Sequence, residues 1–361
     1  MKVNGTPMRS IWPVGEAAVG VIDQTLLPHR FETRLLESAA AVEHAIRTMV
    51  VRGAPLIGVA GAYGLALALR ADASDASLAT ARALLLAARP TAVNLRWALE
   101  RLHADVAGLP PGNRAVAAWA TAGRIAEEDV ELNRAIGRHG ATLLRSLHAR
   151  LARPVNVLTH CNTGWLAAVD HGTALSVIYA AHDEGIPVHV WVDETRPRNQ
   201  GLLTAWELAA HGVPHTLIVD TAGGHLMQHG QVDIAVVGAD RVSAQGDVAN
   251  KIGTYLKALA AHDNRVPFYA AVPSPTIDWH ITDSLHSIPI EDRASSEVLV
   301  VAGLDPQGVL ASVQLLPAGT AVANPAFDVT PARLMTGIIT ERGVAAPARL
   351  ADLFPERRQA A

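Results

Sequence analysis

From about Pro154 onward, short apolar runs alternate with segments of helical periodicity, and this alternation limits the possible fold more than any other feature of the chain. Apolar runs without alternating polar positions are typical of strands that are buried on both faces of a parallel sheet. Their alternation with helices predicts a doubly wound, Rossmann-like α/β domain. The predicted strands are 155–158, 188–192, 216–219, 234–237 and 268–272.

The part of the chain before this region is mainly helical in character. Apolar residues recur there at helix spacing, and two short runs, 11–13 and 19–23, are typical of strands. We therefore predict a helical N-terminal domain with short initial strands over 1–150, a Rossmann-like catalytic domain over 151–345, and a loosely held C-terminal tail over 346–361. The predicted helices are 37–51, 54–70, 78–88, 95–106 and 115–136.

Length and composition are those of a soluble enzyme, since half of the 361 residues are apolar and can fill sizeable cores. The net charge of −4 and the lack of basic runs give no sign of nucleic-acid or membrane binding, although a small anionic substrate is compatible. The most apolar run, 54–69, is shorter than the roughly 20 residues that span a bilayer, so we expect a buried helix. A single cysteine and an N-terminus without a signal-peptide core predict a cytoplasmic location.

Polar residues follow several of the predicted strands at their C-terminal ends. Cys161 follows 155–158, and Asp240 follows 234–237. Because ligands of open parallel sheets bind beyond these strand ends, we expect the thiol and the carboxyl group to face one pocket. A free cysteine is more often a small buried hydrophobic residue, and the alternative for Asp240 is a capping role or a pair with Arg241. The strand-end position of both residues favours the functional interpretation.

Two basic positions are candidates for phosphate binding. A helix is predicted to begin near Asp247, which would place Asn250 and Lys251 in its first turn beside free backbone N–H groups. The alternative is that Lys251 is an ordinary solvated lysine. Arg52 precedes the most apolar segment, and Gly53 would let the backbone approach a ligand closely. Spacing alone does not distinguish this from a helix-end arginine that pairs with a carboxylate.

Cofactor motifs are missing from the sequence. No Gly-x-Gly-x-x-Gly motif follows a predicted strand and no Walker-type loop is present, which disfavours nucleotide cofactors. His225 and His229 have the i, i+4 spacing of metal ligands, but no cysteine or acidic partner accompanies them in sequence. We therefore expect neither a cofactor nor a metal.

The chain resembles the S-methyl-5-thioribose-1-phosphate isomerases in six motifs that cover almost its whole length. Six separated motifs in the same order are specific for this superfamily, which includes ribose-1,5-bisphosphate isomerases and regulatory subunits of the eukaryotic translation-initiation nucleotide exchange factor. The motifs are 52–60 (Arg-Gly-Ala-Pro-Leu-Ile-Gly-Val-Ala), 94–98 (Asn-Leu-Arg-Trp-Ala), 159–164 (Thr-His-Cys-Asn-Thr-Gly), 193–197 (Asp-Glu-Thr-Arg-Pro), 238–241 (Gly-Ala-Asp-Arg) through 251–255 (Lys-Ile-Gly-Thr-Tyr), and 324–331 (Asn-Pro-Ala-Phe-Asp-Val-Thr-Pro).

This resemblance implies a homodimer with a site between the two domains, and a reaction that needs neither metal nor nucleotide. The implied reaction isomerises 5-methylthioribose 1-phosphate, a phosphorylated pentose, to 5-methylthioribulose 1-phosphate in methionine salvage. Cys161 and Asp240 align with the catalytic pair of the family. The aligned substrate-binding positions are Arg52, Gly53, Ala54, Arg96, Gln200, Asn250 and Lys251.

The implied chemistry explains the catalytic pair. The phosphate on the anomeric carbon prevents spontaneous opening of the sugar ring, so a protonated Asp240 would supply a proton to the ring oxygen. Hydrogen then moves from C2 to C1, either through an enediol with Cys161 as the base or as a direct hydride shift in a dry pocket. The sequence leaves both routes open.

Two departures from the family leave the substrate open. The turn after Gln200 is one residue short, with Leu202 alone before the next motif, and Trp165 stands where a small residue is usual. Both changes could reshape the pocket around the 5-substituent of the sugar. The alternatives are a 5-deoxyribose 1-phosphate isomerase, dual use and, less favoured, a ribose-1,5-bisphosphate isomerase. Retention of Cys161 and Asp240 argues against a non-catalytic regulatory subunit.

Overall fold

The computed structural model describes residues 1–3, 5–89, 91–281, 284–317 and 319–357. Its central sheet has seven strands in the order β18-β17-β12-β9-β6-β7-β8, and every neighbouring pair is parallel except β17 with β18. All the strands predicted after Pro154 lie in this sheet. The strands are β6 (Val155–Thr159), β7 (Val188–Asp193), β8 (His215–Ile218), β9 (Ile234–Val237), β12 (Phe268–Ala271), β17 (Gly337–Thr340) and β18 (Gly343–Ala345).

The strand order confirms the predicted Rossmann-like, doubly wound fold. The chain builds β6, β7 and β8 outward in one direction, then returns to place β9, β12 and β17 on the other side of β6. Val157 of β6 pairs with Ile234 of β9 at the point where the direction reverses. In such sheets the reversal point opens a crevice at the carboxyl ends of the strands. The helices between the parallel strands include α6 (Ala174–Asp183), α7 (Gln200–His211), α8 (Ala222–Gln228) and α9 (Thr254–Asp263).

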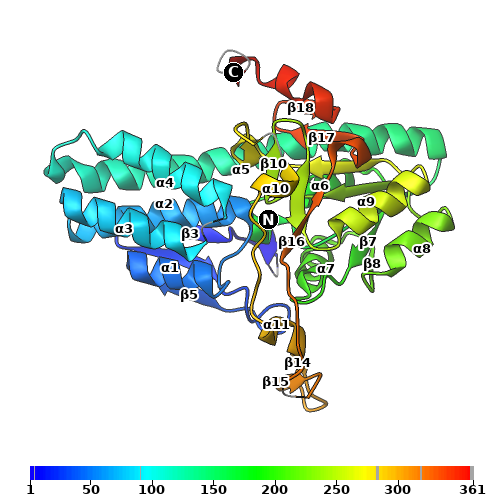
Figure 1. The fold of residues 1–361 in the computed structure, drawn as a ribbon, viewed down its shortest axis with the longest axis horizontal. Helices are drawn as coiled ribbons and strands as arrows, with labels where there is room; N and C mark the ends of the chain where they lie inside the picture. Colours follow the sequence, from blue (N-terminus) through cyan, green and yellow to red (C-terminus); the bar gives the residue numbers. More distant parts are fainter. Residues whose placement is uncertain (4, 90, 282–283, 318, 358–361) are drawn as a thin grey trace.

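The predicted helical region gathers on the opposite side of the molecule from the sheet (Figure 1). Helix α2 lies at its centre and contacts α1, α3, α4 and α5. Among the described residues, α2 is the only helix long and apolar enough to cross a membrane, but 83% of its 18 residues are buried in the protein. It is a core helix, as predicted. The helices are α1 (Ala39–Arg47), α2 (Ala54–Ala71), α3 (Asp75–Ala88), α4 (Val93–Val106) and α5 (Pro111–Leu151).

Helix α5 is much longer than the predicted 115–136. It packs against α2 near its start and against α6 further along, so Ala141 and Leu144 are fully buried on the sheet side. Gly137 and Gly140, which weaken a helix in isolation, follow directly after the predicted end. Here both glycines let α5 approach α6 closely, since a Cβ at Gly137 would lie 2.8 Å from the carbonyl oxygen of Ser176.

Smaller sheets surround this framework. The predicted N-terminal strands are present as β3 and β4, which pair with β5. The hairpin β14–β15 projects from one end of the molecule (Figure 1). The remaining strands are β1 (Lys2–Val3), β2 (Thr6–Pro7), β3 (Ile11–Val14), β4 (Ala18–Ile22), β5 (Thr33–Leu36), β10 (Arg241–Ser243), β11 (Val248–Lys251), β13 (Ile277–Asp278), β14 (Val300–Leu304), β15 (Leu310–Gln314) and β16 (Phe327–Thr330).

Short helical turns complete the described chain. They are α10 (Ser284–Ser287), α11 (Ser296–Leu299) and the 3₁₀ turns η1 (Trp165–Ala167), η2 (Ser274–Thr276), η3 (Ala332–Leu334), η4 (Pro347–Leu353) and η5 (Pro355–Arg357).

The prediction that a helix begins near Asp247 is wrong. Residues 248–251 form β11, which pairs with β10 on one side and β16 on the other, and the helix α9 begins only at Thr254. Asn250 and Lys251 therefore lie on a strand. The N–H groups of Gly253 and Tyr255, at the start of α9, donate to the Asp328 carboxylate at 2.7 and 3.1 Å. This helix start is thus satisfied by a protein carboxylate instead of a phosphate.

The C-terminal segment also differs from the prediction of a loose tail. Leu350 in η4 is fully buried, and the Phe354 ring packs on Trp279 with the ring centroids 5.4 Å apart. Apolar contacts therefore hold this segment against the sheet domain. The last part of the predicted tail, 358–361, lies outside the described residues. The domain limits at 150 and 345 stay predictions.

Candidate active site

A pocket lies beyond the carboxyl ends of β6 and β9, at the point where the strand order reverses. It encloses about 550 Å³, open solvent included. Cys161 and Asp240 both line it, so the structure brings the two strand-end residues together as expected. The lining residues are Met49, Arg52, Gly53, Ala54, Pro55, Arg89, Cys161, Asn162, Thr163, Ala167, Thr173, Gln200, Ala239, Asp240, Asn250, Lys251 and Phe327.

Six of the seven predicted substrate-binding residues line this pocket, and Arg96 does not. Arg96 is exposed on α4 and lines a separate pocket together with Asp278. Gly53 lines the pocket, but its backbone packs closely against Ala167 of the same chain. At a φ of 97°, a Cβ on Gly53 would lie 2.5 Å from the Cα of Ala167, so the close approach expected for a ligand is made to η1.

Three cationic side chains surround the pocket. The buried Arg52 guanidinium donates to the side-chain and backbone oxygens of Asn162, both at 2.5 Å. Lys251 lies opposite Phe327 in the β11–β16 register, with its Nζ 5.0 Å from the ring centroid. Arg89 was not foreseen, because it follows α3 as an ordinary helix-end arginine would. Its guanidinium contacts Glu291 at 3.1 Å.

This arrangement suits an anionic group. Because three cations, Arg52, Arg89 and Lys251, line one small pocket, their charges attract a phosphate strongly in this low-dielectric setting. The first turn of α2, which begins at Ala54, also faces the pocket and adds the positive end of a helix dipole. The helix start that faces this pocket is therefore that of α2, and not the predicted one near Asp247.

Burial changes the ionisation of the two reactive groups. It raises the pKa of the Cys161 thiol, although the charges of Arg52 and Lys251 act in the opposite direction. It also raises the pKa of Asp240 against the lowering effect of Arg89, Lys251 and Arg52. A neutral thiol and a carboxyl group that keeps its proton to a higher pH than usual therefore face the same space. Such a carboxyl group can act as a general acid.

A buried carboxylate holds the loop after Cys161. Glu207 on α7 accepts hydrogen bonds from the Asn162 amide at 2.9 Å, the Trp165 N–H at 2.9 Å and the Tyr179 hydroxyl at 2.8 Å. Burial raises the pKa of Glu207. Because Asn162 in turn accepts from Arg52, Glu207 sets the position of a pocket cation without lining the pocket itself. Sequence reasoning missed Glu207, which lies 43 residues beyond Gly164 in the chain.

Three polar atoms of pocket-lining residues have no protein partner among the described residues. They are Gln200 Oε1, at the start of α7, Thr163 Oγ1, in the loop after β6, and Arg89 Nε, after α3. All three are buried, and a buried polar atom without a partner is costly. A ligand with several hydroxyl groups would supply the missing hydrogen bonds.

The two departures from the family pattern have different positions. Trp165 is 1% exposed, packs on Trp206 at a centroid distance of 6.1 Å and does not line the pocket. The expectation that its ring narrows the pocket is therefore wrong. Leu202, in the shortened turn, lines a neighbouring pocket of about 930 Å³, open solvent included, which shares Met49, Arg52 and Gln200 with the first.

Fold and site together define an α/β protein with a cationic, nucleotide-motif-free pocket at the switch point of its sheet. The chain belongs to the initiation factor 2 subunit family, whose model matches residues 50–347. It is 63% identical over its full length to the whole of a protein named methylthioribose-1-phosphate isomerase from Methylobacterium nodulans. A protein of the same name from Rhodospirillum rubrum is 60% identical, with 100% of this chain and 95% of that protein covered.

Two solved structures share the fold at similar sequence identity. The 5-methylthioribose 1-phosphate isomerase of Pyrococcus horikoshii is 39% identical, with a TM-score of 0.82 and with 98% of this chain and 97% of that chain covered. The translation initiation factor eIF-2B subunit delta of A. fulgidus is 38% identical, with a TM-score of 0.78 and coverage of 97% and 100%. The family thus includes proteins with enzyme names and proteins with initiation-factor names on one architecture.

Proposed function

We propose that this chain is an intramolecular oxidoreductase that converts 5-methylthioribose 1-phosphate to 5-methylthioribulose 1-phosphate in methionine salvage. The observation that carries the proposal is the placement of Cys161 and Asp240 in one cationic pocket. Full-length identity of about 60% to proteins named methylthioribose-1-phosphate isomerase supports it. A non-catalytic regulatory role gives no reason for a thiol and a carboxyl group of raised pKa to share this pocket.

In the proposed mechanism, Arg52, Lys251 and the start of α2 bind the phosphate. Asp240, whose pKa burial raises, donates its proton to the ring oxygen, and the C1–O bond of the ring breaks. The positive charge that develops at C1 is relieved when hydrogen arrives there from C2. The C2 hydroxyl returns a proton to the Asp240 carboxylate, and C2 becomes the ketone.

The raised pKa of Cys161 bears on how hydrogen moves from C2 to C1. A neutral thiol cannot remove a proton, so the enediol route requires Cys161 to lose its own proton first. A direct hydride shift has no such requirement and favours a dry pocket. Substrate carrying deuterium at C2 separates the routes. The label appears at C1 of the ketose after a hydride shift and is lost to water through an enediol.

The test of the proposed function is turnover of the purified protein with three sugars. We expect ketose formation, followed by NMR, from 5-methylthioribose 1-phosphate. The comparison sugars are 5-deoxyribose 1-phosphate and ribose 1,5-bisphosphate. No ketose from any of the three would overturn the proposal.

The 5-deoxy sugar remains the second candidate, alone or in dual use, because the shortened turn places Leu202 beside the substrate pocket. Ribose 1,5-bisphosphate stays the less favoured alternative. Glu297 lines the neighbouring pocket together with Arg52 and Arg198, and its bonds to Arg293 and Arg198 outweigh burial and lower its pKa to about 2. Because this carboxylate engages Arg198 at 2.9 Å, a second phosphate would compete with it for that arginine.

Finer features of the proposal concern the state of the protein. We propose a homodimer in the cytoplasm, with no nucleic-acid or membrane partner, as expected for enzymes of this kind. Light scattering during size-exclusion chromatography measures the mass directly. A 38.0 kDa species would contradict the dimer.

A further inference from the structure

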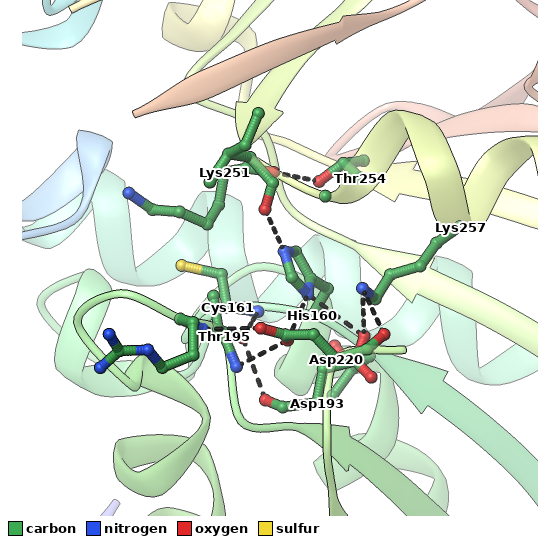
Figure 2. Close-up of polar contacts among 12 residues, drawn as sticks. His160, Cys161, Asp193, Thr195, Asp220, Lys251, Thr254 and Lys257 are labelled. Atoms are coloured by element: carbon green, nitrogen blue, oxygen red, sulfur yellow. Dashed lines mark hydrogen bonds and ion pairs between the residues drawn. The ribbon is translucent and has the colours of Figure 1, made fainter. Parts of the chain in front are cut away.

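His160 directly precedes Cys161 in the chain, yet it does not line the pocket. It follows β6 directly, and the chain then turns at Cys161, which has a φ of 68°. In Figure 2 the Cys161 thiol and the Lys251 side chain extend toward the same side, whereas the His160 ring lies away from them. The ring is 1% exposed.

Both nitrogens of this buried ring face hydrogen-bond acceptors. Nδ1 is 3.2 Å from Asp193 Oδ2, and Nε2 is 2.9 Å from the backbone carbonyl oxygen of Ile252. A neutral imidazole carries only one N–H and would leave one of these contacts as a repulsion between lone pairs. The imidazolium form donates to both acceptors.

Carboxylates outnumber the other cations around the His160 ring. The Lys257 ammonium, 5% exposed, is 3.1 Å from Asp193 Oδ2, and Asp220 approaches His160 Nδ1 at 3.9 Å. Burial raises the pKa of a third carboxyl group, Asp328, and the charges of His160 and Lys257 act in the opposite direction. His160, Asp193 and Asp220 are also close enough to hold a metal ion, but Asp193 is already paired with the Lys257 ammonium.

This cluster connects the two sides of the pocket. Ile252, whose carbonyl oxygen accepts from His160, directly follows Lys251 on β11. On the other side, the hydroxyl of Thr195 accepts from the Cys161 N–H at 2.8 Å and donates to the Asp193 carbonyl oxygen at 3.0 Å. A series of hydrogen bonds therefore links the backbone at Cys161 to the backbone next to Lys251, and it passes through His160 and Asp193 (Figure 2).

We propose that His160 is held as an imidazolium and that, together with Asp193, it is a positioning residue that fixes the Cys161 thiol relative to the Lys251 ammonium. The ring joins the end of β6 to the end of β11 across the switch point of the sheet. Its effect on turnover rests on the proposed isomerase function. Its protonation and its effect on the thiol do not.

The first test is the ring ¹⁵N NMR spectrum of the wild-type protein at about pH 8, where a solvated histidine is neutral. We expect one histidine with both ring nitrogens protonated. The signal should vanish in His160→Gln and persist in His211→Gln, a matched control in which a surface histidine pairs with Asp183 at 2.8 Å. Absence of such a signal from the wild type overturns the proposal, whether or not the variant folds.

The second test measures the consequences for the thiol. The alkylation rate of Cys161 by iodoacetamide should change by about threefold or more in His160→Gln and stay unchanged in His211→Gln. The kcat should fall by about tenfold to a hundredfold while KM stays within about threefold, because misalignment affects the reacting thiol and leaves the substrate-binding groups present. Unchanged alkylation and unchanged kcat would overturn the positioning role. A wild type without turnover would instead refute the proposed function and leave the spectrum and the alkylation rates as the test.

Discussion

Cys161 and Asp240 are the residues on which the proposed reaction depends most directly. We expect Cys161→Ser, Cys161→Ala and Asp240→Asn each to lower kcat by about a hundredfold or more, the usual contribution of a positioned acid or base. The fold should persist, because each change is nearly isosteric or removes one atom of a pocket wall. Circular dichroism checks folding, and turnover checks the role. Near-wild-type kcat in a folded variant would remove that residue from the mechanism.

Lys251 tests the position of the phosphate. Truncating one partner of a desolvated charge pair costs about 2–4 kcal/mol, so Lys251→Ala should lower kcat/KM by a corresponding factor. Lys2→Ala is the control, because Lys2 is exposed on β1 at a distance from the site in sequence and fold. If kcat/KM is the same in both variants, the phosphate binds elsewhere.

Trp165 belongs to the core, so its replacement should affect stability instead of substrate choice. Trp165→Ala removes a fully buried ring and should lower the free energy of unfolding by about 3–5 kcal/mol. The ratio of kcat/KM for the methylthio and deoxy sugars should stay unchanged. Leu202→Ala provides the contrast and should shift that ratio by about tenfold. Urea titration and the two-substrate assay measure these quantities, and a shifted ratio in Trp165→Ala would contradict the core assignment.

The sequence was sufficient to place Cys161 and Asp240 at one pocket because strand ends in a parallel sheet converge at one edge. Arg89 escaped prediction because it reaches the pocket from the end of α3, where no local pattern distinguishes it from a solvated arginine. Arg96 was assigned by family resemblance alone, and its helix α4 turns the side chain toward a different pocket. Local sequence patterns therefore do not predict residues whose position depends on how separate elements pack together.

At the scale of elements, the region after Asp247 shows that apolar residues at helix spacing can also belong to a strand followed by a helix. Val248 and Leu256 share a face of a hypothetical helix, but Val248 is buried in strand β11 whereas Leu256 is 68% exposed on α9. Pairing with β10 and β16 outweighs the helical periodicity here. Such long-range pairing is not visible in a local window of sequence.

The turn between β6 and η1 depends on the absence of a side chain at Gly164. A Cβ there would lie 2.5 Å from Cδ of Glu207, so Gly164→Ala should displace this carboxylate and, through Asn162, the Arg52 guanidinium. We expect a loss of about 1–3 kcal/mol in the free energy of unfolding and a reduced kcat/KM. Gly123→Ala in α5, where a Cβ meets no atom within 4 Å, should be neutral or stabilising. Equal stability of both variants would contradict the proposed packing.

At the scale of the whole molecule, α5 packs against both the helical region and the sheet domain, and so forms a joint between them. The alternation of strands and helices that predicts the fold does not reveal this joint. The core around the sheet includes Ile22 and Leu27 from the N-terminal region as well as Ile136 from α5. The two predicted domains therefore share apolar contacts. Domain limits predicted from a change in the pattern of apolar residues do not show how much surface the two domains bury against each other.

Asp129 lies on α5 at this joint and makes the stability of the molecule depend on pH. Its buried carboxyl group accepts from the Val169 N–H at 2.8 Å, and burial raises its pKa to about 7. In the unfolded chain the group loses its proton near pH 4, so between about pH 4 and pH 7 the folded state binds more protons. By linkage, the free energy of unfolding then falls as pH rises through this window, by about 4 kcal/mol at most.

Asp129→Asn should therefore remove that part of the pH dependence, because the amide stays neutral and still offers an oxygen to the Val169 N–H. Urea unfolding at about pH 5 and about pH 8 measures it. The stability of the variant relative to wild type should rise between the two pH values. Asp263→Asn, at an exposed position at the end of α9, should show no such rise. A difference between Asp129→Asn and wild type that is the same at both pH values would mean that Asp129 ionises normally and that the joint between α5 and Val169 tolerates its charge.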